Sequence, residues 1–234
     1  MPRPSSRVLK AVLVTALATS LLPWVAARSP ASSVPGDASV LDPDIVYTGR
    51  WDTSSGTTAV PNWAGSYLQT DFTGTTVKIK GGGPVNLYTS IDGGPDTFYE
   101  AARGTINLTP TPLRAGTHTL RVAYRSGDTA FRGLVLDPGA HTVRPSVPSG
   151  LVEFVGDSIT AGALNPRLAL DSYAWKTGEK LGMRHTQMAR FGYCLVARTG
   201  CVGQSSQFFD EGSAGNQPWD FSRYQASAVV IASR

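Results

Sequence analysis

The chain has 234 residues and a net charge of +4; 41% of its residues are hydrophobic and 16% are charged, with 25 glycines, 16 prolines and 2 cysteines. These figures exclude a disordered tail, a collagen-like fibre, a disulfide-dense miniprotein and a polytopic membrane protein. The length suits one large domain or two small ones.

The first 27 residues have the pattern of a secretory signal peptide. Three cations (Arg3, Arg7 and Lys10) precede a mostly apolar run over 11–27 that ends in small residues, as at a cleavage site. The alternative is an uncleaved membrane anchor, but the run is short for a bilayer span and Pro23 interrupts it. We therefore expect a signal peptide over 1–27 and a secreted, extracellular protein.

Cleavage of this segment changes the charge balance. It takes the net charge from +4 to +1 because three cations are removed. The mature chain then has no electrostatic reason to bind nucleic acid, and nothing in it predicts stable insertion into a membrane. Residues 28–44, which are rich in Ser, Pro and Gly, predict a flexible linker.

Residues 45–144 predict an antiparallel β-sandwich of the jelly-roll kind. Short runs of β-branched and aromatic residues alternate there with turn residues. The expected strands are 45–51, 66–72, 75–79, 85–91, 97–101, 117–124 and 131–136. Frequent turns, including an Asp-Gly-Gly hairpin signal at 92–94, and the lack of a helical period favour this class.

A different pattern follows from residue 150. An apolar run of strand length over 151–155 is typical of a buried parallel strand. A helix over 172–181 and further strands over 185–189 and 226–231 complete the pattern. Strand, helix, strand, long loop and strand predict a parallel α/β sheet in a second domain over 150–234.

Ser158 is the candidate nucleophile of this second domain. It follows the first strand at the carboxyl end of an open parallel sheet, where such folds place their ligand sites. Gly156 permits a tight turn there, and Ser158 can offer both its hydroxyl and its backbone N–H to an acyl group. In the alternative, Asp157, Ser158 and Thr160 merely cap a helix, where such residues are favoured.

Residues 154–162 (Phe-Val-Gly-Asp-Ser-Ile-Thr-Ala-Gly) resemble the first signature block of the SGNH, or GDSL-type, hydrolases, which cleave esters with a serine nucleophile. A β-sandwich before that block resembles the layout of family-two carbohydrate esterases, which deacetylate plant cell-wall polysaccharides. The similarity extends over about 45–231. Other stretches that carry it are 47–52, 72–75, 92–94, 172–175 and 189–192.

The resemblance implies a flavodoxin-like SGNH domain and a role for each matching residue. Ser158 would attack the acyl carbonyl, and the backbone N–H groups of Ser158 and Gly192 would form the oxyanion hole, with Gly156 and Asp157 supporting the motif. A glycine after a strand is also a common turn residue, which is the alternative for Gly192. The expected substrate is an acetylated polysaccharide or another ester, such as a lipid, with no cofactor and no metal.

The sequence departs from the family after its third strand. No Gly-x-Asn-Asp block follows 226–231, and the Asp-x-x-His block that supplies the catalytic base is missing, so we expect a chain truncated within an incomplete SGNH domain. His118 and His141 belong to the first domain. His185 opens the second strand, and five residues at about 3.3 Å each put it roughly 15 Å from Ser158. We expect His118 and His141 to be surface or structural groups and His185 to be structural.

Two rival interpretations of the chain stay open. It is a non-catalytic polysaccharide-binding remnant, or an esterase with a non-carbohydrate acyl substrate. Aromatic residues of the first domain that offer stacking surfaces for sugars, although strand aromatics are more often core, are Trp51, Trp63, Tyr67, Tyr88 and Tyr99. A sheet that ends at its third strand also leaves an apolar edge over 229–231, which favours aggregation.

Cys194 and Cys201 are the only cysteines. An even count in a secreted chain predicts one disulfide, which would close a small loop after the second strand of the α/β domain. Two free thiols are the alternative.

Overall fold

The computed structural model describes residues 35–125, 130–212 and 217–233. The predicted signal peptide, and residues 28–34 of the predicted linker, lie outside the described residues. Residues 35–44 are not a flexible linker, so that part of the prediction is wrong. β1 (Pro35–Ala38) pairs antiparallel with β11 (Phe131–Pro138), and Ala38 and Val40 are buried in the core.

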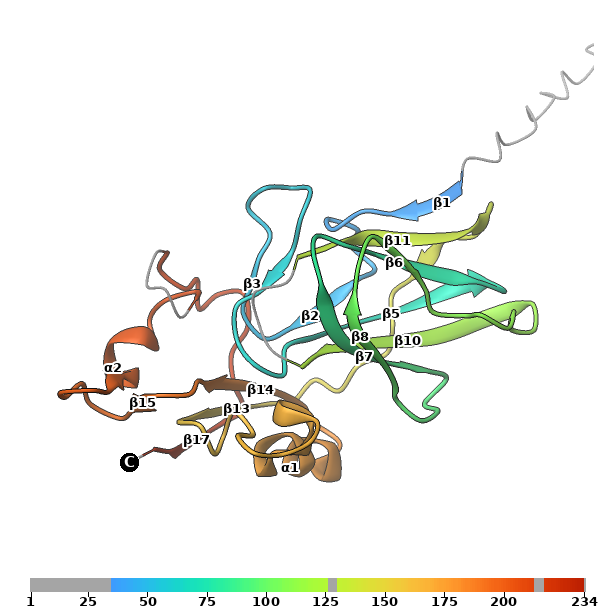
Figure 1. Cartoon of the computed structure of the whole chain (residues 1–234). Coiled ribbons are helices and arrows are strands. Elements are labelled where there is room, and N and C mark those ends of the chain that lie inside the picture. Colours follow the sequence, from blue (N-terminus) through green and yellow to red (C-terminus); the bar gives the residue numbers. More distant parts are fainter. Residues whose placement is uncertain (1–34, 126–129, 213–216, 234) are drawn as a thin grey trace, which may run out of the picture. The chain divides into compact units, whose positions relative to one another are not determined.

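Residues 35–144, called here the β region, form two antiparallel sheets (Figure 1). One has the order β1-β11-β6-β9, and the other has the order β12-β5-β10-β7-β8 with β2 also paired to β5. The remaining strands of these sheets are β2 (Val46–Thr48), β5 (Tyr67–Gly74), β6 (Val77–Gly81), β7 (Val85–Ile91), β8 (Thr97–Ala102), β9 (Thr105–Asn107), β10 (Gly116–Tyr124) and β12 (Thr142–Val143). A separate short pair consists of β3 (Trp51–Asp52) and β4 (Val60–Pro61).

Alternation along the strands builds one apolar core from both sheets. Leu68 and Phe72 of β5 are buried, and they share the core with Ile79 of β6 and Leu134 of β11. Gln69 and Asp71, which alternate with them, point the other way and are half-buried. This period of two is what a half-buried antiparallel strand requires.

The aromatic residues proposed as stacking surfaces for sugars belong mainly to the interior. Trp51 and Trp63 are fully buried, Tyr67 and Tyr88 are buried, and Tyr99 is partly buried against the core. Their rings pack on other side chains, so they present no open platform.

Residues 150–233, called here the α/β region, contain a parallel sheet of order β14-β13-β17 (Figure 1). Its strands are β13 (Leu151–Gly156), β14 (Arg184–Ala189) and β17 (Ala228–Ala232). The predicted combination of a β-rich region followed by an α/β region is confirmed. Smaller elements are a 3₁₀ turn (Leu168–Asp171), β15 (Tyr193–Cys194), β16 (Val202–Gly203) and α2 (Gln204–Gln207).

Helix α1 (Tyr173–Leu181) has a capping residue at each end. The Ser172 side chain accepts a hydrogen bond from the backbone N–H of Trp175, which satisfies one of the free donors of the first turn. Gly182 ends the helix in the left-handed conformation, with φ +62°. The predicted helix over 172–181 therefore holds to within one residue.

The central strand of the parallel sheet and its outer strand β17 differ in exposure. Every residue of the central strand β13 is buried. Every residue of β17 is exposed, with 50% of Val229, 39% of Val230 and 62% of Ile231 open to solvent. Among the described strands β17 has a neighbour on one side only, as predicted for this edge. No helix in the described ranges is long and apolar enough to span a membrane.

His118 makes the stability of the β region pH-dependent. Its Nδ1 lies 2.7 Å from Asp92 Oδ2 and its Nε2 lies 2.7 Å from the Arg114 carbonyl oxygen. Both partners are acceptors, so only the imidazolium form, with two N–H donors, satisfies both contacts. The hydrogen bond to Asp92, followed by that to Arg114, raises the pKa of His118.

We expect His118→Gln to cost more stability near pH 6 than at about pH 8. A raised pKa in the folded state contributes stability that is present below the unfolded pKa and is lost as pH rises through the folded pKa. Urea unfolding at both pH values measures the difference, with His141→Gln as the control. An equal loss at both pH values would show that the contacts do not depend on the charged ring.

Candidate active site

Ser158 lies in a tight turn directly after the carboxyl end of β13. A Cβ atom on Gly156 would collide with the Thr160 hydroxyl oxygen and with the Ala232 carbonyl oxygen, so only glycine lets the chain turn this closely against β17. The strand is buried and the turn is at the surface, which brings Ser158 out of the sheet to a partly exposed position.

Backbone hydrogen bonds fix the shape of this turn. Asp157 Oδ1 accepts from the N–H of Ile159 at 2.9 Å, and the Asp157 carbonyl accepts from the N–H of Ala161 at 3.0 Å. The Ser158 carbonyl accepts from the N–H of Ala163 at 2.8 Å. No helix begins at residues 157–160, so the alternative of a helix cap is wrong. The Ser158 hydroxyl has no hydrogen bond to any described residue and is free for a ligand.

Thr160 anchors the turn from below. It is fully buried, its hydroxyl lies 2.9 Å from the Tyr173 hydroxyl, and it donates to the Ala232 carbonyl at 3.3 Å. The turn is thus held between α1 and β17. Gly162 has φ +83°, and a Cβ there would collide with the Leu168 backbone, so it also requires glycine.

Gly192 lies in the loop after β14. Gly156 of β13 pairs with Ala189 of β14, so the loops that carry Ser158 and Gly192 leave the same edge of the sheet. Gly192 is exposed, with φ +80°, and its carbonyl accepts from the N–H of Val202 at 3.2 Å. Neither its own N–H nor that of Ser158 donates a hydrogen bond to a described residue, so both are available as donors.

Gln204 positions this edge of the sheet, and it was not among the residues predicted from the sequence. Its side chain is buried, and Nε2 donates to the carbonyls of Gly156 at 2.8 Å and Met188 at 2.7 Å. One amide therefore holds the ends of β13 and β14 together beneath Ser158. Gln204 begins the short polar helix α2, which no motif marks in the sequence.

An apolar cavity of about 300 Å³ lies on the open face of the sheet beside these residues. Val155 of β13, Val229 and Ile231 of β17, and Gln204 line it. The other lining residues come from the loop and short helix before β17 and from the loop near Cys194; they are Leu195, Ser205, Phe208 and Phe209.

Arg50 links the β region to the centre of the parallel sheet. Its side chain is fully buried, and Nη2 lies 3.6 Å from Glu153 Oε1 of β13. Nη1 donates to the carbonyls of Phe208 at 2.5 Å and Asp210 at 2.7 Å. Tyr224 donates from its hydroxyl to Glu153 Oε2 at 2.6 Å.

Three aromatic rings surround the same guanidinium group. Its central carbon lies 5.1 Å from the ring centres of Phe208 and Trp219 and 5.4 Å from that of Phe221. Arg50 therefore holds Phe208, Trp219 and Phe221 near β13, the strand that precedes Ser158.

None of the three histidines of the chain contacts Ser158. His118 and His141 lie in the β region. His185 is buried near the amino end of β14, opposite Val152, and its Nε2 lies 3.1 Å from Glu179 Oε1. The centre of its ring lies 4.5 Å from the centre of the Trp175 ring.

Cys194 and Cys201 form a disulfide with their Cα atoms 5.9 Å apart. The bond closes the loop that follows Gly192 and so restricts the wall of the apolar cavity. In the described ranges no group of three or more His, Cys, Asp or Glu side chains is arranged to hold a metal ion.

This chain is similar in sequence to known carbohydrate esterases. Residues 47–145 match the family model described as "Carbohydrate esterase 2 N-terminal". The chain is 28% identical over 215 residues to the cellulase/esterase CelE of Acetivibrio thermocellus, which covers 81% of this chain and 26% of that protein.

Solved structures show the same similarity. A family two carbohydrate esterase from Clostridium thermocellum, in complex with cellohexaose, is 26% identical with a TM-score of 0.68, covering 80% of this chain and 64% of the other. One from Cellvibrio japonicus shares the fold at 22% identity and a TM-score of 0.72, covering 85% and 66%. The chain thus spans about a quarter of CelE and 64% of the Clostridium structure. The resemblance to family-two carbohydrate esterases, which are ester hydrolases, is therefore confirmed.

Proposed function

We propose that Ser158 is the nucleophile of a carbohydrate esterase, within a family-two layout whose domain boundary lies at 145–149. The observation that carries this proposal is the free Ser158 hydroxyl at the carboxyl edge of the sheet, in the Gly156–Gly162 turn. The free N–H groups of Ser158 and Gly192 at the same edge support it.

The proposed reaction proceeds through an acyl-enzyme. The Ser158 oxygen bonds to the carbonyl carbon of an acetyl ester while its proton passes to a base. The C–O bond between the acetyl carbon and the sugar oxygen then breaks, and the sugar oxygen takes up that proton and leaves as a hydroxyl group. Water next attacks the acetyl-serine and releases acetate. The N–H groups of Ser158 and Gly192 stabilise the oxyanion, a contribution of about 3–4 kcal/mol per donor.

Acetylated polysaccharide is the proposed substrate. The Clostridium thermocellum relative is solved with cellohexaose, a glucan oligosaccharide, and this supports a carbohydrate as the alcohol component. Secretion fits an insoluble cell-wall substrate, and we propose it from the signal-like pattern over 1–27, outside the described residues.

A non-catalytic binding function is the second candidate. The observation that favours it is that none of the chain's three histidines is placed to accept the proton of Ser158. A serine hydroxyl without a base is a weak nucleophile at neutral pH.

Chemical rescue tests the role of Ser158. Added imidazole supplies a mobile base, and we expect it to raise the protein-dependent hydrolysis of 4-nitrophenyl acetate by at least about tenfold, part of the 10²–10⁴ that a positioned base contributes. Ser158→Ala is expected to show no rescue, because the attacking hydroxyl is gone.

The control is Ser149→Ala, an exposed serine near the other end of β13 whose side chain makes no hydrogen bond to a described residue. It should be rescued like the unmodified chain. Equal imidazole-dependent rates in Ser158→Ala would remove Ser158 from the mechanism. A further comparison of acetylated xylan with long-chain acyl esters separates the carbohydrate substrate from a lipid one.

A further inference from the structure

A patch of polar side chains covers the outer face of the second sheet of the β region. In the strand register Arg121 of β10 lies opposite Gln69 of β5 on one side and Ser90 of β7 on the other. Two residues along, Thr119 of β10 lies opposite Asp71 of β5. Because side chains alternate between faces, these five residues share the face that points away from the core.

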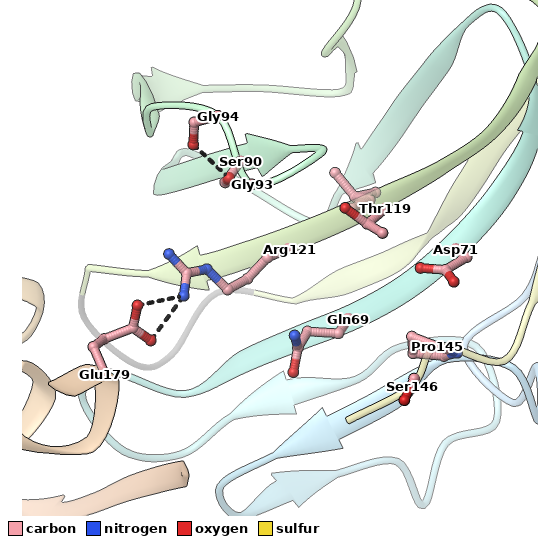
Figure 2. A pocket seen from close by; sticks show the side chains of 11 residues that line it. Gln69, Asp71, Ser90, Gly93, Gly94, Thr119, Arg121, Pro145, Ser146 and Glu179 are labelled. Carbon is pink, nitrogen blue, oxygen red and sulfur yellow. Dashed lines mark hydrogen bonds and ion pairs between the residues drawn. The ribbon is translucent and has the colours of Figure 1, made fainter. Parts of the chain in front are cut away.

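This patch is hollowed into a groove, unlike a flat solvated sheet. A cavity of about 320 Å³ lies over it, bounded by the turn at Gly93 and Gly94, by Pro145 and Ser146, and by Glu179 of α1 (Figure 2). A second cavity of about 200 Å³ continues from it and shares Gln69, Arg121 and Glu179. The larger one alone lies within the size range of small-ligand sites.

The groove holds polar groups with unused hydrogen-bonding capacity. The side chains of Gln69, Asp71, Thr119 and Ser146 make no hydrogen bond to any described residue. The Oδ1 atom of Asp71 is also shielded from solvent without a partner. Structural carboxylates elsewhere in the chain are satisfied: Asp137, for example, accepts hydrogen bonds from the backbone and side chains of two threonines.

The ionised carboxylate of Asp71 is unfavourable for the folded state. Burial raises the pKa of Asp71, and the nearby Asp92 carboxylate raises it further. A carboxyl group with a raised folded-state pKa destabilises the folded protein at neutral pH, where it is ionised. A residue that weakens the fold and faces a groove is typical of a binding site rather than of packing.

The charges of the groove disfavour an anionic ligand. Arg121 Nη1 donates to both carboxylate oxygens of Glu179, at 2.8 and 2.9 Å (Figure 2). Its Nη2 also lies 3.5 Å from Asp96 Oδ1, so carboxylates offset the charge of Arg121. Asp71 then leaves an acceptor that repels phosphates and other anions. Its carboxylate, the Gln69 amide and the Thr119 hydroxyl provide mixed donors and acceptors, the groups that pair with neighbouring sugar hydroxyls. We propose that this groove binds a neutral, hydroxyl-rich ligand, a short oligosaccharide.

The proposed groove is separate from Ser158. Glu179 lies near the end of α1 and contacts His185, close to the amino end of β14, whereas Ser158 follows the carboxyl end of β13. The two positions are therefore at opposite edges of the parallel sheet. The inference does not depend on Ser158 being catalytic, and a polysaccharide held in the groove would raise the local concentration of chain segments near the other edge.

Isothermal titration with cellohexaose and with xylohexaose tests this proposal on the full chain. We expect measurable binding of at least one of them. Asp71→Ala should weaken it by about tenfold to a hundredfold, the effect of losing a hydrogen bond to a charged group. Thr119→Val should weaken it by about threefold to tenfold.

Two controls test whether the binding depends on the groove itself. Thr117 lies two residues before Thr119 on the same face of β10, but it does not line the groove. Thr117→Val makes the same chemical change as Thr119→Val, and this variant should bind the sugar like the unmodified chain. Ser158→Ala should also bind normally. The thermal midpoint of Asp71→Ala should be no lower than that of the unmodified chain, because its carboxylate has no partner to lose.

Three results would overturn the proposal. They are no binding of either sugar by the unmodified chain, equal weakening by Thr117→Val and Thr119→Val, and loss of binding in Ser158→Ala. The last would place the sugar at Ser158 instead. The imidazole rescue is measured independently of sugar binding, so failure of either proposal leaves the other intact.

Discussion

The 234-residue chain is expected to hydrolyse a chromogenic acetate ester about 10⁴ to 10⁶ times more slowly than a family-two carbohydrate esterase assayed beside it. We expect this low rate because the Ser158 hydroxyl has no hydrogen bond to a base within the described residues. A serine nucleophile without a base keeps only the small part of its rate advantage that comes from stabilisation of the oxyanion and from binding.

Initial rates with 4-nitrophenyl acetate measure this difference without added imidazole. The comparison enzyme is the Clostridium thermocellum relative at equal concentration, and heat-inactivated protein gives the background rate. Rates within about tenfold of that relative would show that another group in this chain serves as the base.

Arg50→Met is expected to lower the free energy of unfolding by about 3–5 kcal/mol. The variant leaves the Glu153 carboxylate, only 3% exposed, without its ion-pair partner at the centre of the sheet. It also removes the donor to the carbonyls of Phe208 and Asp210. Breaking one half of a buried pair costs far more than removing both halves, because the remaining charge stays in a medium that solvates it poorly.

Urea unfolding of three variants measures this effect. Arg50→Met with Glu153→Gln should recover much of the stability that the single variant loses, since it leaves no unpaired charge. Arg132→Met, at an exposed arginine of β11 with no ion pair to a described residue, should change stability by less than about 0.5 kcal/mol. A single variant as stable as Arg132→Met would mean that the Arg50 cluster contributes little.

The periodic features of the fold could be predicted from the sequence because their cause is local. β7 has the bounds expected from its run of strand-forming residues, and α1 matches the helix expected over 172–181 to within one residue. The glycines at 156 and 162 also follow from local chain geometry. The linker prediction failed over 35–44 because Ser, Pro and Gly there suggest mobility, whereas pairing with β11 depends on a strand about a hundred residues away.

The features that the sequence did not predict depend on distant partners. Arg50 stands in a strand-like stretch where a charged residue is normally exposed, and it is buried because residues more than 150 positions later fold over it. Gln204 has its role only because two strand ends bring their carbonyls within reach of one amide. The groove likewise depends on strand register, which sets Asp71 opposite Thr119.

The open side of β17 makes concentration a variable in every measurement on this chain. Within the described residues, the backbone groups on one side of β17, beside Val229 and Ile231, pair with no strand and form a template on which another strand can add. Collisions between molecules grow with the square of concentration, so dilute samples stay monodisperse longest. Cooling helps as well, because attraction between apolar surfaces weakens at low temperature.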